Sequence, residues 1–289
     1  MTPDLSRLPR PSRSLSRSRT ACAFMSLLCL TQVARAADTL RYQGGVRNSI
    51  ESAKLNPKQL NLVLKSLKAK SGFEELHFDS DGFLRIGDPQ RFSGGSASAR
   101  ALLLAAVSSS QLVELENLSR SPEVAFARLA AVAIYESRST GKRIVVQPLQ
   151  IDFSDFDYLR GTSEVVASFD LGFAILHELV HAVLDLHDTG LGGDGLGDCE
   201  QYINIIRREL GLPERQAYLA TVRDSVQSST GVSTKLAELQ FARALDRDGK
   251  TRIEHYYLNW EAQRVGRLSV QTAAPVAMKA GGATVTIAQ

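Results

Sequence analysis

The sequence is poor in cysteine. Only Cys22, Cys29 and Cys199 occur in its 289 residues, and the first two lie in an N-terminal stretch that we expect to be removed on export. The one remaining thiol can form no disulfide within the chain. A small disulfide-stapled framework, common among exported proteins, is therefore excluded.

Long apolar runs are also scarce. The run ACAFMSLLCLTQV at residues 21–33 is too short to cross a bilayer, which needs roughly 20 residues, and no second long run follows. We find no internal repeat and no basic-aromatic patch, so we expect neither a nucleic-acid partner nor stable membrane insertion. A hydrophobic content of 44% with 22% charged residues excludes a wholly disordered or fibrous chain.

The first 36 residues have the order of a secretory signal peptide. A basic segment precedes the apolar run, and Ala34-Arg35-Ala36 supplies a small-x-small cleavage site. Leu28 stands where a lipoprotein site needs a small residue before its cysteine, so we expect no lipid anchor. Cleavage after Ala36 removes six Arg and one Asp and changes the formal net charge from +3 to −2. We therefore expect a bacterial protein that is periplasmic or secreted.

The remaining chain mixes helical and strand patterns and predicts an α+β fold. Residues 37–95 hold an amphipathic helix at 57–70 and a hairpin about Ser80-Asp81-Gly82. These residues form a separate domain, a propeptide over the cleft, or part of one fold. Residues 96–265 form the expected catalytic domain, and residues 266–289, which are poor in charge, an expected flexible tail.

Four further elements are predicted within 96–265. Ala, Leu and Val at helical spacing predict helices at 99–118 and 122–138, the second starting at Ser121-Pro122-Glu123. Residues 142–153 predict a strand, and Pro148 favours an edge position or a bulge for it. Residues 238–260 predict a second hairpin with a longer loop at Asp246–Lys250.

The segment that carries chemistry is the helical stretch 169–188, with HELVH at 177–181. His177 and His181 lie one turn apart on one face, so two imidazoles can bind the same ion. Glu178, about 100° around the helix, can reach a water held by that ion. Apolar residues cover almost all the rest of this helix, so two His and a Glu in it need a partner, which a metal ion supplies. We expect one Zn²⁺ per chain.

Tetrahedral zinc with an open position needs a third protein ligand. Glu200 lies beyond a Gly-rich connection, in the first turn of a helix predicted from Asp198 to Gly211, and we favour it. His187 has the spacing of a metzincin ligand, but on a helix that continues past Leu184 it would face away from the metal. Asp198 is a third alternative. We expect Cys199 to be a small buried residue outside the site.

Residues 170–218 resemble the zinc endopeptidases of the NleD-like type, which include bacterial effectors and toxins. The resemblance consists of LHELVHA and of a second stretch similar to the family pattern N-x-I-R-x-E-x-G-L-P-x-R-x-x-Y, running from Asn204 to Tyr218. It implies a zincin fold of the gluzincin type, with Glu200 as the acidic third ligand and Glu178 as the catalytic base. Several members of this family are delivered by other routes, whereas this chain begins with what resembles an export signal. The resemblance therefore does not imply which protein is cleaved.

Together these observations predict an exported zinc metalloendopeptidase that acts on a protein or peptide. Zinc would activate a water from which Glu178 takes the proton. Tyr218 and Arg215, just past the second helix, are positional candidates for transition-state stabilisation. Two alternatives stay open: a catalytically inactive zincin-like binding module with structural zinc, and a metzincin-like peptidase that uses His187. The sequence does not indicate the cleavage preference or distinguish endopeptidase from exopeptidase action.

Overall fold

The computed structural model describes residues 43–50, 53–136, 141–188, 195–226, 233–266 and 283–285. The predicted signal peptide lies outside these residues, as does most of the predicted C-terminal tail. All described residues belong to one compact unit, Gln43–Gln289. This unit contains several helices and three sheets, so the fold is mixed α and β, as predicted.

The first sheet combines parallel and antiparallel pairs. Strands β1 (Gly45–Asn48), β4 (Leu112–Asn117) and β7 (Arg143–Ile151) run parallel in that order. The short strands β5 (Ala127–Leu129) and β6 (Ala133–Glu136) pair antiparallel with the other side of β7. Because β1 pairs with β4, residues of the 37–95 region contribute a strand to the same sheet.

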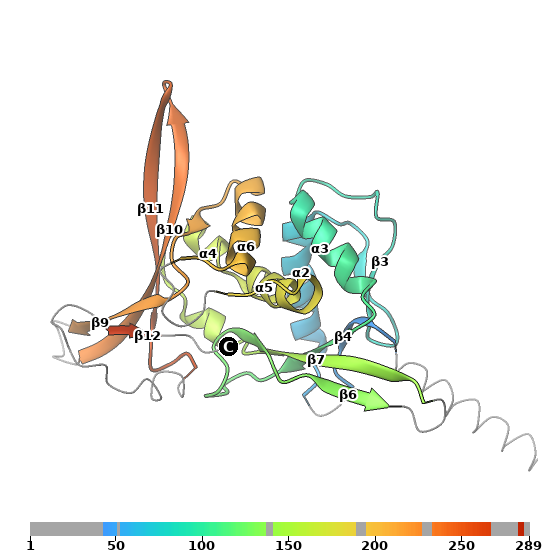
Figure 1. Cartoon of the computed structure of the whole chain (residues 1–289). Coiled ribbons are helices and arrows are strands. Elements are labelled where there is room, and N and C mark those ends of the chain that lie inside the picture. Colours follow the sequence, from blue (N-terminus) through green and yellow to red (C-terminus); the bar gives the residue numbers. More distant parts are fainter. Residues whose placement is uncertain are drawn as a thin grey trace, which may run out of the picture. The chain divides into compact units, whose positions relative to one another are not determined.

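Four helices pack together beside this sheet (Figure 1). They are α2 (Pro57–Ser71), α3 (Ala97–Val107), α5 (Leu171–Leu184) and α6 (Asp198–Glu209), and α5 contacts each of the other three. A capping box between Asn56 and Gln59 starts α2, and Gly72 ends it in the left-handed conformation. The short helix α4 (Ser163–Ala167) comes just before α5.

The C-terminal half forms a second, antiparallel sheet. Its long hairpin consists of β10 (Ser233–Arg247) and β11 (Lys250–Glu261), flanked by β8 (Glu214–Arg215), β9 (Ala220–Val226) and β12 (Ala283–Val285). Asp248 and Gly249 both have positive φ in the hairpin turn, as a two-residue type I′ turn requires. A separate small hairpin pairs β2 (Leu76–Phe78) with β3 (Leu84–Ile86).

The structure confirms several predicted elements and corrects others. The helix at 57–70, both hairpins and the strand within 142–153 are present, although the loop of the second hairpin is shorter than predicted. The helix predicted at 99–118 ends at Val107, and the helix predicted at 122–138 is wrong, because its described residues, 122–136, contain β5 and β6 and no helix. For Pro148 the edge alternative is wrong, since β7 has strand neighbours on both sides. The bulge alternative fits, because three residues between β5 and β6 lie opposite only Gln147 and Pro148. Pairing with β7 outweighs the helix propensity of the Ala-rich stretch.

Two hydrophobic clusters form the core. One joins the helix group to the first sheet, and the other surrounds Phe241 and Trp260 of the second sheet. The stretch Ser163–Leu184 has the length and the apolar composition of a helix that could cross a membrane. However, 56% of its 18-residue apolar segment is buried inside the protein. Its apolar surface is therefore used largely in packing.

A buried carboxyl group lies where these clusters approach each other. Asp155, in a 3₁₀ turn (Asp155–Tyr158), accepts a 2.9 Å hydrogen bond from the backbone N–H of Phe126. Phe126 has a φ of 62°, an uncommon conformation for this residue type. Burial, together with the nearby charge of Asp152, raises the pKa of Asp155 to about 7 although the Phe126 N–H opposes the shift.

This buried carboxyl group predicts a pH-dependent stability. Between about pH 4 and 7 the folded state retains a proton that the unfolded chain has released, so the free energy of unfolding falls as pH rises. Asp155→Asn keeps an acceptor for Phe126 without a charge. We expect it to flatten this fall and to be about 2 kcal/mol more stable than the wild type at pH 7, with no gain at pH 4. Denaturant unfolding across this range, with exposed Asp157→Asn as control, tests it; a parallel profile for Asp155→Asn would contradict it.

Candidate metal centre

Helix α5 positions the two histidines. Asp170 caps the helix by accepting the Phe173 N–H at 3.1 Å. The helix ends at Leu184, because Asp185 adopts the left-handed conformation with φ 54° and ψ 32°. The chain therefore turns back toward α5 after Leu184, which the prediction of a continuing helix did not include. This turn brings Asp188 to the two histidines.

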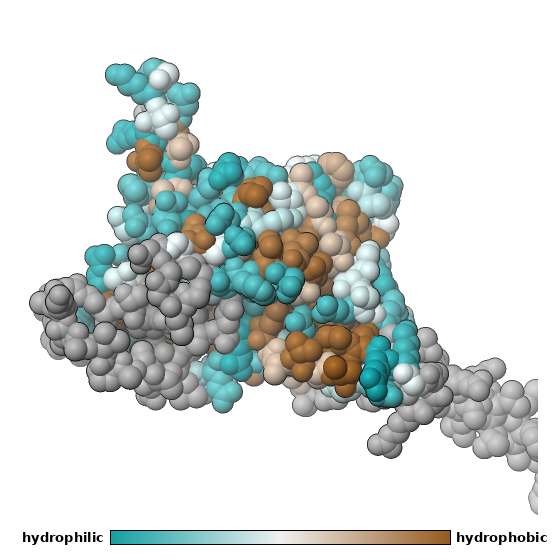
Figure 2. Space-filling view, viewed as in Figure 1, coloured by the Kyte–Doolittle hydropathy of each residue, from teal (hydrophilic) through white to brown (hydrophobic). Residues whose placement is uncertain are grey.

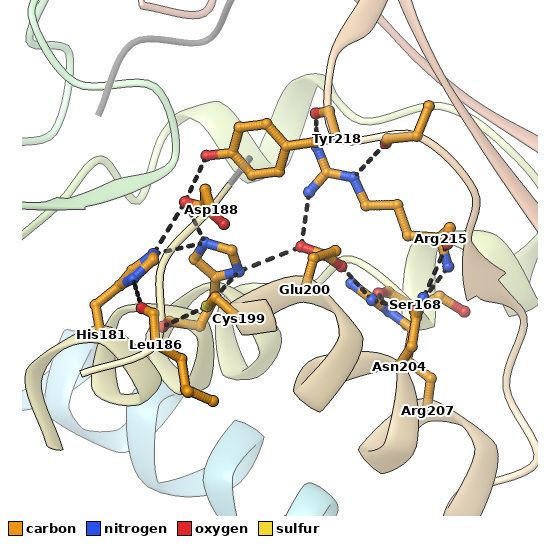
Figure 3. A network of polar contacts seen from close by, with 12 residues as sticks. Ser168, His181, Leu186, Asp188, Cys199, Glu200, Asn204, Arg207, Arg215 and Tyr218 are labelled. Carbon is orange, nitrogen blue, oxygen red and sulfur yellow. Dashed lines mark hydrogen bonds and ion pairs between the residues drawn. The ribbon is translucent and has the colours of Figure 1, made fainter. Parts of the chain in front are cut away.

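Three ligand atoms converge at one point (Figure 3). The Nε2 atoms of His177 and His181 lie 3.2 Å apart, and Oδ2 of Asp188 lies 3.4 Å from the first and 3.0 Å from the second. Ligands at 2.0–2.1 Å from a tetrahedral zinc ion are separated by about 3.3 Å. The separations observed here therefore fit a single small metal ion.

The outer nitrogen of each ring fixes its tautomer. Nδ1 of His177 lies 3.2 Å from Oε2 of Glu200, and Nδ1 of His181 lies 2.6 Å from the backbone oxygen of Leu186. Both acceptors need a proton on Nδ1, which leaves the Nε2 lone pairs directed at the point of convergence. Two lone pairs and a carboxylate oxygen at this separation require a positive charge between them.

The electrostatics of the cluster agree with this requirement. Burial lowers the pKa of His181, but the interactions with Asp188 and Cys199 together outweigh it and raise this pKa to about 10. Burial raises the pKa of Asp188, but its bonds to both histidines bring this pKa far below its ordinary range. Both shifts favour positive charge in the cluster, and a divalent cation could replace the protons that otherwise supply it.

Glu200 lies beside His177 but away from the point of convergence. Its Oε2 contacts Nδ1 of His177 and, at 3.1 Å, Nη1 of Arg215, and its Oε1 accepts from Arg207. The side chain is buried, and although burial raises its pKa, the two guanidinium groups bring that pKa well below the usual range. The structure thus places Glu200 behind His177, and Asp188 occupies the position at Nε2 that sequence reasoning gave to Glu200.

This buried cluster predicts a large stability effect. Glu200→Gln would leave Arg207 and Arg215 buried without a carboxylate, and we expect a loss of about 3 kcal/mol in the free energy of unfolding. The matched control is Glu214→Gln, which removes the carboxylate from the exposed ion pair with Arg208 and should cost at most about 1 kcal/mol. Equal losses in the two variants, measured by chemical denaturation, would contradict this assignment.

Two other sequence interpretations concern residues near the site. Cys199, interpreted from the sequence as lying outside it, has its Sγ 3.5 Å from Nδ1 of His177 and belongs to the group that could hold a metal ion, with His177, His181 and Asp188. The prediction that Cys199 is buried is confirmed, but its exclusion from the site is wrong, because the first turn of α6 directs the thiol toward α5. The side chain of His187 is exposed and lies outside this group.

Glu178 lies beside the cluster and reaches the first sheet. Its Oε2 accepts a 2.9 Å hydrogen bond from the backbone N–H of Leu129 in β5. The side chain is buried, and burial raises its pKa, opposed by the two neighbouring histidines. A buried carboxylate with a raised pKa is suited to accept a proton.

Tyr218 and Arg215, the two candidates for transition-state stabilisation beyond α6, differ in their surroundings. Tyr218 donates a 2.9 Å hydrogen bond from its hydroxyl to Oδ2 of Asp188, and its ring stacks on His177 at 6.3 Å between centroids. Arg215 is instead engaged by Glu200 and by the backbone oxygens of Ala217 and Tyr218. Only the Tyr218 hydroxyl reaches the group of ligand atoms.

Comparison with known proteins adds no relative. No protein-family model matches the chain, and searches of curated proteins and of solved structures returned no match. The geometry of the residues described above is therefore the basis for what the site can do: a group formed by His177, His181, Asp188 and Cys199 that could hold a metal ion.

Proposed function

We propose that this chain is an exported zinc-dependent peptidase in which His177, His181 and Asp188 hold the metal and Glu178 is the general base. The observation that carries the proposal is the convergence of both Nε2 atoms and Oδ2 of Asp188 at 3.0–3.4 Å. The Sγ of Cys199 contacts Nδ1 of His177, the outer ring nitrogen, and not Nε2, so in this proposal the thiol does not bind the metal. Two imidazoles and one carboxylate then leave a position open, as catalytic zinc sites do and structural ones do not. In this proposal the helical HELVH segment belongs to a zincin-like domain.

Zinc at such a site lowers the pKa of water toward about 7 and polarises a carbonyl group. Side chains of the protein supply proton transfer, the orientation of the ligands and a hydrogen-bond donor. Glu178 is adjacent to His177 on α5 and can take up a proton and return it to a leaving amine. Glu200 and the Leu186 carbonyl orient the two imidazoles. Tyr218, held on Asp188, is a hydroxyl donor at the edge of the site.

A peptide is the substrate that best fits the surroundings. The hydrogen bond between Leu129 and Glu178 places one edge of β5 against the proposed base, and the opposite edge of β5 pairs with β7. An extended peptide can add to such an outer strand. Apolar surface gathers over β6 and β7 on the face shown in Figure 2. The side chains of Ile134 and Tyr135 in β6 are exposed.

The stretch that resembles the NleD-like endopeptidases supports the same proposal. Its polar residues Asn204, Arg207, Arg215 and Tyr218 are all in contact with Glu200 or Asp188, or with each other. Four of the five polar residues of the quoted pattern therefore belong to one connected group of side chains around the candidate metal site. The fifth, Glu209, instead accepts hydrogen bonds from Ser96 and Ser98 at the start of α3.

Metal removal and reloading test the proposal. We expect one equivalent of zinc per chain by elemental analysis, loss of casein hydrolysis on chelation, and its return when zinc is added back. Zinc-dependent melting without hydrolysis of any peptide would contradict the peptidase proposal and favour the binding module. N-terminal sequencing of the exported protein tests cleavage after Ala36.

A further inference from the structure

A pocket opens directly beside the proposed base. It has a cavity volume of about 60 Å³ and includes His177 and Glu178 in its lining. A substrate side chain that enters it therefore belongs to a residue next to the scissile bond. The nature of the remaining lining decides which side chains fit, and this inference rests on the proposed peptidase function.

The walls of the pocket are apolar and rigidly held. Phe126, Phe169 and Phe173 line it, together with small residues that leave space between them, among them Ala174. Phe126 packs edge to face on Phe169 at 5.0 Å and on Trp260 at 5.3 Å. Aromatic walls fixed in this way favour another aromatic or large aliphatic side chain.

One wall of the pocket consists of buried charged groups that pair with each other. Arg207 and Arg215 line it with the carboxylate of Glu200 between them. Glu200 is engaged by both guanidinium groups and by His177. A basic substrate side chain would enter a desolvated pocket beside two guanidinium groups whose carboxylate is already engaged, which is unfavourable.

We propose that this pocket selects a large apolar side chain, aromatic in preference, next to the scissile bond and rejects lysine and arginine. A phenylalanine side chain removes much more apolar surface from water than alanine does when it enters such a pocket. We therefore expect a preference of at least about 10-fold in kcat/KM for Phe over Ala at that position, and the lowest values for Lys and Arg.

Cleavage-site profiling of a proteome-derived peptide library tests this directly. The zinc-loaded wild type should give products in which one of the two positions flanking the cut is dominated by Phe, Tyr and Leu and depleted of Lys and Arg. Frequent Lys or Arg at both flanking positions, or no enrichment at either, would overturn the pocket proposal alone. Absence of any cleavage would overturn the peptidase proposal and this one with it.

A pocket-filling variant adds a second test. Ala174 lies one helical turn before Glu178 on α5 and lines the pocket, so Ala174→Leu should reduce the Phe-over-Ala preference about 10-fold at unchanged zinc content. Ala101→Leu, on the exposed side of α3, is the matched control and should keep the preference. Calorimetric binding of Phe and Ala peptides to zinc-loaded Glu178→Ala should show the same order without turnover. Equal binding of the two peptides would contradict the proposal.

Discussion

Replacing Glu178 by glutamine is expected to lower kcat/KM for peptide hydrolysis by about 10² to 10⁴-fold, the usual contribution of a general base. Glutamine retains an oxygen that can accept the Leu129 N–H but cannot take up a proton at neutral pH. The side chain is not among the atoms that converge on the metal position. Zinc content and melting temperature should therefore stay close to those of the wild type.

The measurement needs both quantities from the same preparation. Initial rates on a quenched fluorescent peptide give kcat/KM, and elemental analysis gives zinc per chain. Glu123→Gln, a carboxylate with 61% side-chain exposure, is the matched control and should leave both unchanged. Hydrolysis by Glu178→Gln at the wild-type rate would show that another group is the base.

Replacing Asp188 by alanine is expected to weaken zinc binding by more than about 100-fold. Loss of a group that only orients a ligand already costs about 10- to 100-fold in affinity, and loss of a direct ligand costs more. Asp188 contacts both Nε2 atoms, whereas Glu200 contacts Nδ1 of His177. Glu200→Gln should therefore lose affinity within the 10- to 100-fold range, and His187→Ala should lose none.

Competition titration with a zinc chelator measures these affinities. The ranking of the three variants separates the three candidate ligands. Retention of zinc by Asp188→Ala together with its complete loss from Glu200→Gln would return Glu200 to the ligand position that its sequence spacing suggests. Loss of zinc from His187→Ala would favour the metzincin-like alternative.

The sequence predicted the two histidines on the helix of the site correctly, but it did not predict that Asp188 lies beside them. The spacing of His177 and His181 sets both on one helical face because the period of the helix is fixed. The position of Asp188 depends instead on the left-handed conformation of one residue, Asp185, at which α5 ends. Aspartate tolerates the left-handed conformation but also adopts others, so its presence does not predict that the helix ends at this residue. Polar residues interrupt the apolar pattern after Leu184, and this interruption is the sequence feature that could have indicated the end of the helix.

The errors in the fold have a similar physical origin. Residues 122–138 have helix-forming composition, yet Leu129 and its neighbours pair with β7, a contact between segments about twenty residues apart. Local propensity cannot reveal such pairing. The same is true of Cys199 and Glu200: the sequence places both in the first turn of α6, but only the packing of α6 on α5 decides that one faces His177 through sulfur and the other through a carboxylate.

X-ray absorption spectroscopy at the zinc edge distinguishes an open zinc site from a closed one, because it reports the atoms bound to the metal in the wild-type chain. We expect one zinc per chain surrounded by nitrogen and oxygen at about 2.0–2.1 Å, with two imidazoles and no sulfur. A sulfur neighbour at about 2.3 Å would place Cys199 among the ligands and close the position that catalysis requires. That result would contradict the open, hydrolytic zinc site proposed for this protein.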